Sequence, residues 1–521
     1  MEIELLKEEL NILNSKLEIQ IKNNNELYIN TTSNEVKAVV ELLLSKFKIT
    51  FVGQFCSQKQ IFTINIILSN RSQGYFIIVR YDTTDELVSL QDITYQGHLF
   101  EREIADLYGI KIIGGKDTRN IVKHEVWQKD VFPLRKEYAF GSKIKPANEA
   151  DEYQFKKVSG SGGYQIPVGP VHAGIIEPGH FRFSAIGEPI ENLEIRLMYK
   201  HKGIEKICEN IDANKLNLVF ERIAGESSAA YAECYALLVE KLMKWEISNE
   251  VKALRVVLLE LERIYNYLDD IAGICVDVAY SYPAKRFNYF SEMIHQLCER
   301  VTGSRFSRNA IVPGGININF TSKHKDDILH TLGSIEKRLN NIIQATLSSV
   351  SFLDRIESTG VLYNKTATKL ILTGVVGRAS DIRYDVRKSF PYEIYKEIKT
   401  KANAELSGGV CERYNLKITE IKDAFEFIRK ALSLIQADIP RTKKEVVIQE
   451  GNEAYAAVET VKGELVVYGQ AGKNNMWNRI YFKTPSFTNW NGLTYAVSGE
   501  IVPDFPLCNK SFNMSYAEND R

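Results

Sequence analysis

The sequence predicts a protein of the α+β class, with a first unit that mixes strands and helices and a larger, mainly helical unit flanked by β structure. Three observations lead to this prediction. Apolar, β-branched runs at 62–70 and 74–82 are separated by turn residues. Apolar residues recur at three- and four-residue steps through much of 228–350. Alternating apolar runs return after residue 453. A chain of 521 residues is long enough for two or three such cores.

The overall charge and hydropathy exclude several classes of protein. Sixty-six basic and 66 acidic residues give a formal net charge of zero, whereas a nucleic-acid binder usually shows a basic excess. No run of 18 apolar residues occurs, so we expect no transmembrane helix. Residues 1–26 are charged and leucine-spaced, and they predict an amphipathic helix on a cytoplasmic protein. We therefore expect no nucleic-acid partner.

The cysteines do not form a metal-binding or disulfide pattern. There are seven, at positions 56, 208, 234, 275, 298, 411 and 508, and no two of them are spaced as CxxC. An odd count without close pairs argues against a disulfide framework and against a cysteine-rich cluster site. We expect these side chains to be reduced and to act mostly as small apolar core residues.

The first unit is predicted to span 1–145, and it carries two charged motifs after its strands. A short helix is expected from residue 100, and a Pro-Leu-Arg element follows about thirty residues later. Together they resemble the 30 kDa subunit of respiratory complex I. The matching residues are Glu101, Arg102, Glu103, Asp106, Leu107 and Gly109, then Phe132, Pro133, Leu134, Arg135 and Lys136. Residues 146–163, rich in Gly, Ser, Lys and Glu, are predicted to be a linker to a second domain at 164–521.

The second unit opens with Gly-Pro corners and short alternating strands, which predict a β hairpin. His172 and His180 lie in this segment. The pattern resembles the large subunit of formate hydrogenlyase, and His172 also matches the first histidine of the corresponding complex I motif. The resemblance implies that His172 or His180 contacts a quinone headgroup. A histidine beside Pro and Gly is, alternatively, often a turn residue bonded to the backbone.

The stretch 220–243 predicts a loop followed by a helix that starts near Ser227 and Ser228, both good N-cap residues. Capping and core packing alone explain this pattern. The loop also resembles the first metal-binding loop of nickel-iron hydrogenases, R-x-C-G-x-C, through Arg222, Ala224, Gly225 and Ser227. The second hydrogenase motif is matched by Asn513, Met514, Ser515, Glu518 and Arg521. Ala224, Ser227, Ser515 and Glu518 stand at the four cysteine positions, and they cannot supply the soft thiolates that nickel and iron need there. We expect no metal site.

The same frame resembles the quinone-proximal 49 kDa subunit of complex I, whose members lack the four cysteines. Its motif AYxLAVEKLL resembles residues 234–243, and its closing FGEVDR resembles 516–521. Because motifs of both the 30 kDa and the 49 kDa subunit occur in one chain, this chain resembles the fused form of the two subunits. The fused form is related to membrane-bound hydrogenases. The resemblance implies that the emptied cavity receives a quinone, bounded by 220–235, the His172 hairpin and Asp385. Tyr231 would donate a hydrogen bond or a proton there.

A long helix is predicted at 251–274, with Glu260, Glu262 and Arg263 between its leucines. It resembles the core helix LLxELERIxxHL of the 49 kDa subunit. A charged stripe on a helix normally faces solvent. The resemblance implies instead that Glu260 and Arg263 lie inside the bundle and form part of a charged path toward the membrane. Both interpretations stand at this point.

The segment 374–392 carries another specific family motif. It resembles GPxxRASGxxxDxRxxxPY of the relatives, with matches at Arg378, Asp385 and Arg387 among others. Arg378 and Asp385 are expected to form a buried pair. A carboxylate beside arginines on the floor of a dry cavity is also a suitable proton donor to a quinol oxygen. In complex I the aspartate of this motif orients the quinone-binding histidine. Beyond it, 453–469 and 479–490 are predicted to be strands.

The resemblance implies a peripheral-arm subunit on the cytoplasmic face of the bacterial inner membrane. Its expected partners are a small iron-sulfur subunit with a four-iron cluster, a membrane subunit, antiporter-like subunits and other peripheral-arm subunits. Electrons would pass from that cluster to the quinone. We find no Gly-rich dinucleotide loop, so this chain should bind neither NADH nor a cluster. The alternatives are a metal-free, hydrogenase-related docking or coupling subunit without quinone chemistry and, less favoured, an active nickel-iron hydrogenase.

Overall fold

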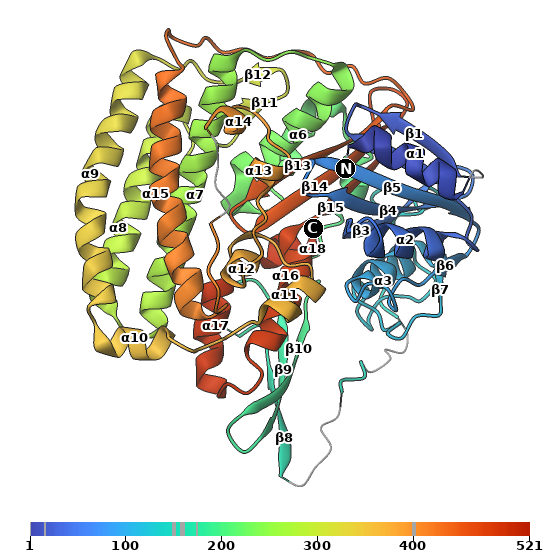
Figure 1. Ribbon diagram of the computed structural model, residues 1–521, viewed down its shortest axis with the longest axis horizontal. Coiled ribbons are helices and arrows are strands. Elements are labelled where there is room, and N and C mark those ends of the chain that lie inside the picture. The colour runs from blue at the N-terminus through green and yellow to red at the C-terminus, as the bar shows by residue number, and fades with distance from the viewer. Residues whose placement is uncertain (1, 15–16, 148–152, 157–161, 173–175, 399–402) are drawn as a thin grey trace.

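A computed structural model describes the chain except for residues 1, 15–16, 148–152, 157–161, 173–175 and 399–402. Figure 1 shows long helices on one side, a sheet-rich N-terminal part on the other, and a three-stranded sheet between them. A second small sheet projects away from this body (Figure 1). The architecture is mixed α+β, as the sequence predicts.

The N-terminal part is built on a five-stranded sheet in the order β1-β2-β5-β4-β3. All neighbouring strands are antiparallel except β2 and β5, which are parallel. The elements are α1 (Ile3–Leu13), β1 (Glu18–Lys22), β2 (Glu26–Asn30), α2 (Val36–Ser45), β3 (Thr50–Gln58), β4 (Phe62–Asn70), β5 (Tyr75–Thr83), β6 (Glu86–Val88), α3 (Gly97–Tyr108) and β7 (Lys111–Ile113). The predicted helix over 1–26 is therefore too long. It ends at Leu13, and Ile19 and Ile21 then alternate with polar residues in β1, a period that suits a strand.

The projecting sheet contains β8 (Gly163–Val168), β9 (His180–Ile186) and β10 (Ile190–Arg196), all antiparallel. Its root is fixed by aromatic packing, because Phe181 and Phe183 both contact the ring of Phe505, with centroids 5.1 and 4.9 Å apart. The predicted hairpin is thus a three-stranded sheet.

The helical part is organised around α7. Of its 29 residues 22 are buried, including Arg255, Glu260, Glu262 and Arg263, so this helix forms the centre of the bundle. Ser248 starts α7 by accepting a hydrogen bond from the Val251 N–H at 3.3 Å. The elements are α4 (Ile204–Cys208), α5 (Asn217–Phe220), α6 (Ser228–Met243), α7 (Asn249–Asp277), α8 (Ser281–Thr302), β11 (Ile311–Val312), β12 (Gly315–Ile316), α9 (Ser322–Leu347), α10 (Val350–Ile356), α11 (Asn364–Lys369), α12 (Gly374–Ala379), α13 (Val386–Ser389), α14 (Tyr395–Ile398) and α15 (Val410–Ser433), with short 3-10 turns at Ala213–Lys215 and Gly225–Ser227.

The C-terminal sheet joins the two sides of the molecule. It contains β13 (Glu453–Thr460), β14 (Gly463–Ala471) and β15 (Trp477–Lys483), and every residue of β13 and β14 is buried. Helix α6 packs on this sheet from the bundle side, and the stacked rings of Phe55 and Tyr481, 4.4 Å apart, join it to β3. Helices α16 (Pro485–Ala496), α17 (Phe505–Phe512) and α18 (Tyr516–Asp520) follow, with a 3-10 turn at Val502–Asp504.

The predicted strand at 479–490 is wrong beyond Lys483. There the chain turns into α16, because the Thr484 hydroxyl accepts a hydrogen bond from the Phe487 N–H at 3.4 Å and Pro485 takes the first helical position. Throughout the described residues, no helix combines the length and the hydropathy needed to cross a bilayer.

Candidate functional site

The start of α6 is held by a carboxylate from α7. Glu262 accepts hydrogen bonds from the N–H groups of Ala229 and Ala230, at 2.7 and 3.1 Å. Burial raises the pKa of Glu262 to about 8. The predicted caps do not act in this way, since the Ser228 hydroxyl donates to the carbonyl of Gly225 at 2.9 Å. The buried hydroxyl of Ser227 has no hydrogen-bond partner among the described residues. A distant acid therefore replaces the local serine caps.

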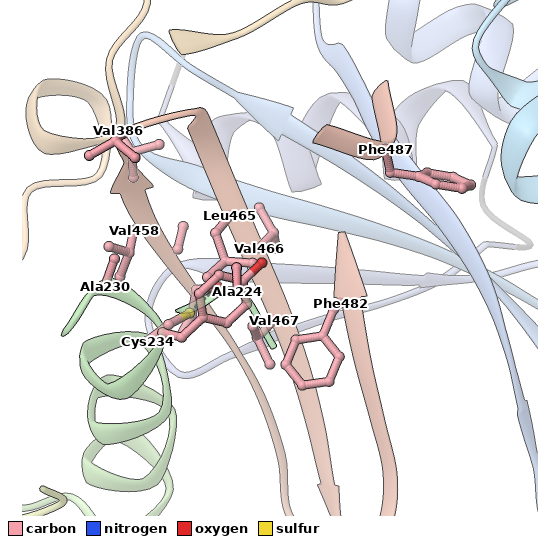
Figure 2. Close-up of a cluster of buried hydrophobic side chains, with 14 of the residues drawn as sticks. Ala224, Ala230, Cys234, Val386, Val458, Leu465, Val466, Val467, Phe482 and Phe487 are labelled. Atoms are coloured by element: carbon pink, nitrogen blue, oxygen red, sulfur yellow. Dashed lines mark hydrogen bonds between the residues drawn. The ribbon is translucent and has the colours of Figure 1, made fainter. Parts of the chain in front are cut away.

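Ala224 lies in an apolar environment. Figure 2 shows it within a cluster of buried side chains, with Ala230 and Cys234 from α6 and with Val466 and Val467 from β14. Close packing of methyl and isopropyl groups fills this side of the loop. Gly225, the next residue, faces the guanidinium of Arg308, which lies 3.2 Å from the position that a Cβ atom would take.

Glu518 of α18 is a buried acid that contacts α6 through Tyr231. It is fully buried, and its Oε1 accepts a hydrogen bond from the Tyr231 hydroxyl at 3.1 Å. Its Oε2 accepts from the N–H of Ser486 at 3.2 Å and from the Ser486 hydroxyl. Burial raises the pKa of Glu518 to about 7, although the bond from Ser486 lowers it. This carboxyl group is therefore poised to gain or lose a proton near neutral pH.

Tyr231 and Ser515 both form hydrogen bonds with Glu518. The pKa of Tyr231 is raised well above its usual value by burial and by the negative charge of Glu518. Ser515 caps α18, its hydroxyl accepting a hydrogen bond from the N–H of Glu518 at 3.2 Å. Arg521 points to the other side, toward Glu205 at 3.3 Å and Glu103 of α3. Arg521 thus ties the C-terminal segment to the N-terminal part.

Asp385 lies at the centre of a buried cluster of charges. Arg387 contacts it through Nη2 at 2.7 Å and Nε at 3.1 Å, and Nη1 of Arg378 lies 3.6 Å away. Burial alone would raise the pKa of Asp385, but the two guanidinium groups hold it well below its usual range. The expected pair of Arg378 and Asp385 is present, but Arg387 is the closer partner.

The cluster extends through α7 and into two further acids. Glu260 contacts Arg263 at 3.2 Å and Arg387 at 3.1 Å, and all three residues are buried. Glu260 and Arg263 thus lie inside the bundle and not on a solvent-facing stripe. Glu420 of α15 and Glu459 of β13 complete the cluster by pairing with Arg378, Glu459 at 2.8 Å. Burial and the nearby Asp385 raise the pKa of Glu459 to about 7.

Three other predicted site residues, Arg222, His172 and His180, have contacts of their own. Arg222 is exposed on the surface, where its Nη1 donates to the carbonyl of Leu218 at 2.7 Å. His172 is exposed near the base of the projecting sheet, with its ring 5.5 Å from that of Phe181. His180 is buried, and its Nδ1 lies 3.3 Å from the carbonyl of Gly169. Burial lowers the pKa of both histidines.

The oxygens of Asp385 are directed at arginines, and within the described residues neither His172 nor His180 is among the hydrogen-bond partners of Asp385. Hollows of about 770, 710, 580 and 270 Å³ are among those that the described residues form, and none of these four has Tyr231, His172 or Asp385 in its lining. The expected cavity is not among these four.

Two protein-family profiles match this chain. The profile described as respiratory-chain NADH dehydrogenase, 49 Kd subunit, matches residues 287–450 and 440–521, and that of the 30 Kd subunit matches 29–143. The chain belongs to the family of fused 30 kDa and 49 kDa complex I subunits. It is 28% identical to the fused C/D subunit of the NADH-quinone oxidoreductase of Phocaeicola vulgatus, over 78% of this chain and 82% of that protein.

This fused complex I family extends to hydrogenases. The chain is 26% identical to formate hydrogenlyase subunit 5 of Escherichia coli, over 81% of this chain and 74% of that protein. Among solved structures, a chain of the archaeal membrane-bound sulfane sulfur reductase has the same fold, with a TM-score of 0.62 and 22% identity. The match covers 69% of this chain and 98% of that one. The relatives thus come from NADH-quinone oxidoreductases and from hydrogenase complexes.

The four positions that match the cysteine ligands of nickel-iron hydrogenases are occupied by other residues in this chain. Ala224 offers no donor and is packed in the apolar cluster of Figure 2. Ser515 caps α18, and Glu518 accepts hydrogen bonds from Tyr231 and Ser486. These hard or absent donors contrast with the soft thiolates that such a centre requires. Within the described residues, no three His, Cys, Asp or Glu side chains are grouped so as to hold a metal ion.

Two residues of the buried charge cluster are missed by reasoning from the sequence. Glu459 lies in the stretch 453–469, which is predicted only as a strand, and no motif points to Glu420. A signal for Glu420 exists, because it falls on the buried face of α15 with Lys417, Ile421 and Ala424. A carboxylate in that position of an amphipathic helix needs a charged partner.

Proposed function

We propose that this chain is the quinone-proximal subunit of a redox-driven, ion-translocating complex at the cytoplasmic face of the membrane. As a member of the complex I family it is related to peripheral subunits of multi-subunit membrane complexes. In the proposed reaction a small iron-sulfur partner, with a four-iron cluster, delivers electrons to a quinone headgroup beside α6. Membrane, antiporter-like and other peripheral-arm subunits complete the complex, and this chain holds neither NADH nor a cluster.

The observation that carries this proposal is the pair of Tyr231 and Glu518. Reducing a quinone to a quinol takes two electrons and two protons, so an acid near the acceptor is required. Glu518 is buried, has its pKa raised to about 7, and is hydrogen-bonded to the Tyr231 hydroxyl at 3.1 Å. A proton held by Glu518 can pass through the tyrosine hydroxyl to an acceptor on the far side of α6's first turn. Within the described residues, His172 contributes no partner to this pair.

Ion movement would be coupled through the buried charge cluster. The cluster joins Asp385 to Glu260 through Arg387, and Glu260 to Arg263, all within α7 and the 374–392 segment. A change of charge at one end of such a dry, connected set shifts the proton affinity of its neighbours. In this proposal, quinone reduction drives the changes of charge along this cluster, and these changes drive the movement of ions.

The second candidate is a metal-free coupling or docking subunit without quinone chemistry. One observation favours it. The groups expected to hold a quinone are already engaged, Tyr231 with Glu518 and Asp385 with Arg387, while His172 lies exposed. An active nickel-iron hydrogenase ranks below both, because the donor set does not suit the metals.

The test is quinone reduction by the intact complex, purified through a tag on this chain and driven with NADH or with reduced ferredoxin. Glu518→Gln and Tyr231→Phe keep the shape of the pair and remove the exchangeable proton. We expect turnover to fall by about a hundredfold, with assembly unchanged. Glu357→Gln, an exposed position, is the control. A complex that assembles and pumps ions without any quinone turnover supports the coupling subunit instead.

A further inference from the structure

Glu233 on α6 is a fully buried acid whose carboxyl group meets no hydrogen-bond donor among the described residues. Its exposure is 0%, and neither of its carboxyl oxygens has a hydrogen-bond partner among the described residues. A buried carboxylate is strongly disfavoured in this condition, so the group must bind something or change its protonation state. Nothing in the sequence singles it out, because it lies between Ala232 and Cys234 in an ordinary helical pattern.

The groups facing Glu233 come from three elements. Arg255 of α7 lies 3.9 Å away, but its guanidinium is bound more tightly by Glu240 at 2.6 Å and by Glu393 at 2.9 Å. Tyr392 completes the surroundings. One guanidinium thus serves three buried carboxylates, which leaves two negative charges uncompensated if all are ionised. Oε2 of Glu393 is, like both oxygens of Glu233, without a donor among the described residues.

We propose that Glu233 and Glu393 share one proton, taken up from the groove that Glu393 lines. The groove has a volume of about 710 Å³ and lies between β5, α6 and the 390–393 segment. Glu240, Tyr392, Glu393, Phe76 and Trp245 are among its lining residues. A proton on either acid supplies the missing donor between the two carboxyl groups. Burial and the charge of Glu393 raise the pKa of Glu233 well above its usual value, in agreement with this assignment.

The proton site is connected to the buried charge cluster. The Tyr392 hydroxyl accepts a hydrogen bond from the N–H of Glu459 at 3.4 Å, and Glu459 pairs with Arg378 at 2.8 Å. When the shared proton leaves the site, a carboxylate remains behind, and bulk solvent restores the proton through the groove. No electron is exchanged in this step. The site itself stands independently, but its role in supplying protons for quinone reduction rests on the proposed function.

The site can be tested on the full chain by infrared spectroscopy. The C=O stretch of a protonated carboxyl group is distinct from that of a carboxylate, and it shifts when the solvent is changed to D₂O. Among the bands of protonated acids at pH 7, we expect one that shifts in D₂O and is lost in both Glu233→Gln and Glu393→Gln. Glu246→Gln, an exposed acid on the groove wall, should retain it. Retention of every protonated-acid band in both folded variants would overturn the proposal, as would a band in the wild type that does not exchange.

Two further measurements separate this proposal from its rivals. Sodium titration that removes the band at constant pH would overturn the proton assignment in favour of a monovalent cation. In the intact complex, Glu233→Gln should lower proton-limited turnover roughly tenfold, more at pH 8 than at pH 6. If the infrared band behaves as expected but the complex reduces no quinone, the proposed function fails and the proton site stands. Turnover at the wild-type rate in Glu233→Gln at both pH values would overturn the supply role.

Discussion

At the scale of single residues, Glu518 makes the stability of the protein depend on pH. Its pKa rises from the usual 4.5 to about 7 in the folded chain, because burial disfavours the charged form. Folding therefore binds a proton between these two values. The stabilisation that this proton supplies is complete below pH 4.5 and is lost as pH rises through 7. A shift of this size is worth about 3 kcal/mol.

The expected result is a difference between the wild type and Glu518→Gln, in which the amide mimics the protonated acid. Between pH 5 and pH 8 the free energy of unfolding of the wild type should fall by about 3 kcal/mol more than that of the variant. Urea denaturation at a series of pH values measures this. Parallel pH curves for the two proteins would show that Glu518 is already ionised at neutral pH.

Asp385 allows a sharper comparison, since the chain contains a surface counterpart with the same spacing. Asp385 and Arg387 form a buried pair at 2.7 Å, whereas Asp381 and Arg383 form a surface pair at 2.9 Å. Asp385→Asn leaves a buried guanidinium without its nearest partner, and we expect a loss of about 3–5 kcal/mol. Asp381→Asn should change stability by less than about 0.5 kcal/mol. Equal effects in chemical denaturation would mean that the buried cluster compensates for the lost charge.

The residue scale is also where reasoning from the sequence reaches its limit. The segment 374–392 correctly places Arg378, Asp385 and Arg387 together, because they are close in sequence. It cannot show that Glu420 and Glu459, from two distant elements, bind Arg378. Likewise, the sequence marks Glu518 only for a missing thiolate, and its contact with Tyr231 spans 287 positions of the chain. Long-range partners of buried charges follow from the fold and not from local spacing.

At the scale of elements, the N-terminus of α6 depends on α7. Glu262 accepts hydrogen bonds from two N–H groups that have no partner within α6, those of Ala229 and Ala230. Glu262→Ala should leave both buried donors unpaired, at a cost of about 1–3 kcal/mol. The amides of 228–231 should then exchange with deuterium faster, while the exchange in the middle of α6 changes little.

The comparison variant for this experiment is Glu292→Ala on α8, where the carboxylate is 42% exposed and pairs with Arg305. It should leave exchange at α6 unaffected. Glu262→Gln is informative as well, since its amide oxygen can still accept one of the two bonds. Faster exchange along the whole of α6 in Glu262→Ala would contradict a local capping role and indicate that the two helices unfold as one unit.

The sequence predicts an element correctly where a local pattern of apolar and turn residues determines its secondary structure. The run at 62–70 matches β4, and the one at 74–82 matches β5 within one residue, because turn residues bound both. The predictions for the start of the chain and for 479–490 fail for a common reason. In each segment, one secondary structure gives way to another after a few residues, at Leu13 and at Thr484, and a single period cannot describe both sides of the change.

At the scale of the whole molecule, the C-terminal sheet is the shared core of the two sides. Its strands β13 and β14 are buried throughout, and Glu453 at the start of β13 binds the N-terminal sheet. Arg80 of β5 contacts Glu453 through two bonds of 2.9 and 2.7 Å, and Lys22 of β1 contacts it at 2.9 Å. Burial would raise the pKa of Glu453, but the bonds from Arg80 and Lys22 lower it to about 2.

Glu453 should therefore control whether the N-terminal part and the bundle unfold together. In Glu453→Ala, Arg80 remains largely buried without its carboxylate, a change that costs about 3–5 kcal/mol at the interface. We expect one cooperative thermal transition in the wild type and two in the variant, the first assigned to 18–83 by hydrogen exchange. Glu41→Ala, exposed on the same N-terminal part, should keep a single transition.

The pH dependence of this coupling has the opposite sign to that of Glu518. Because the folded pKa of Glu453 lies below the usual value of 4.5, its stabilisation is present above that value and is lost as pH falls toward 2. Acidification of the wild type should therefore split its single transition in the same way that Glu453→Ala does at pH 7. If the variant instead unfolds in one step at a lower temperature, the two sides are held together mainly by apolar packing such as that of Phe55 on Tyr481, and the ion pairs contribute stability without controlling cooperativity.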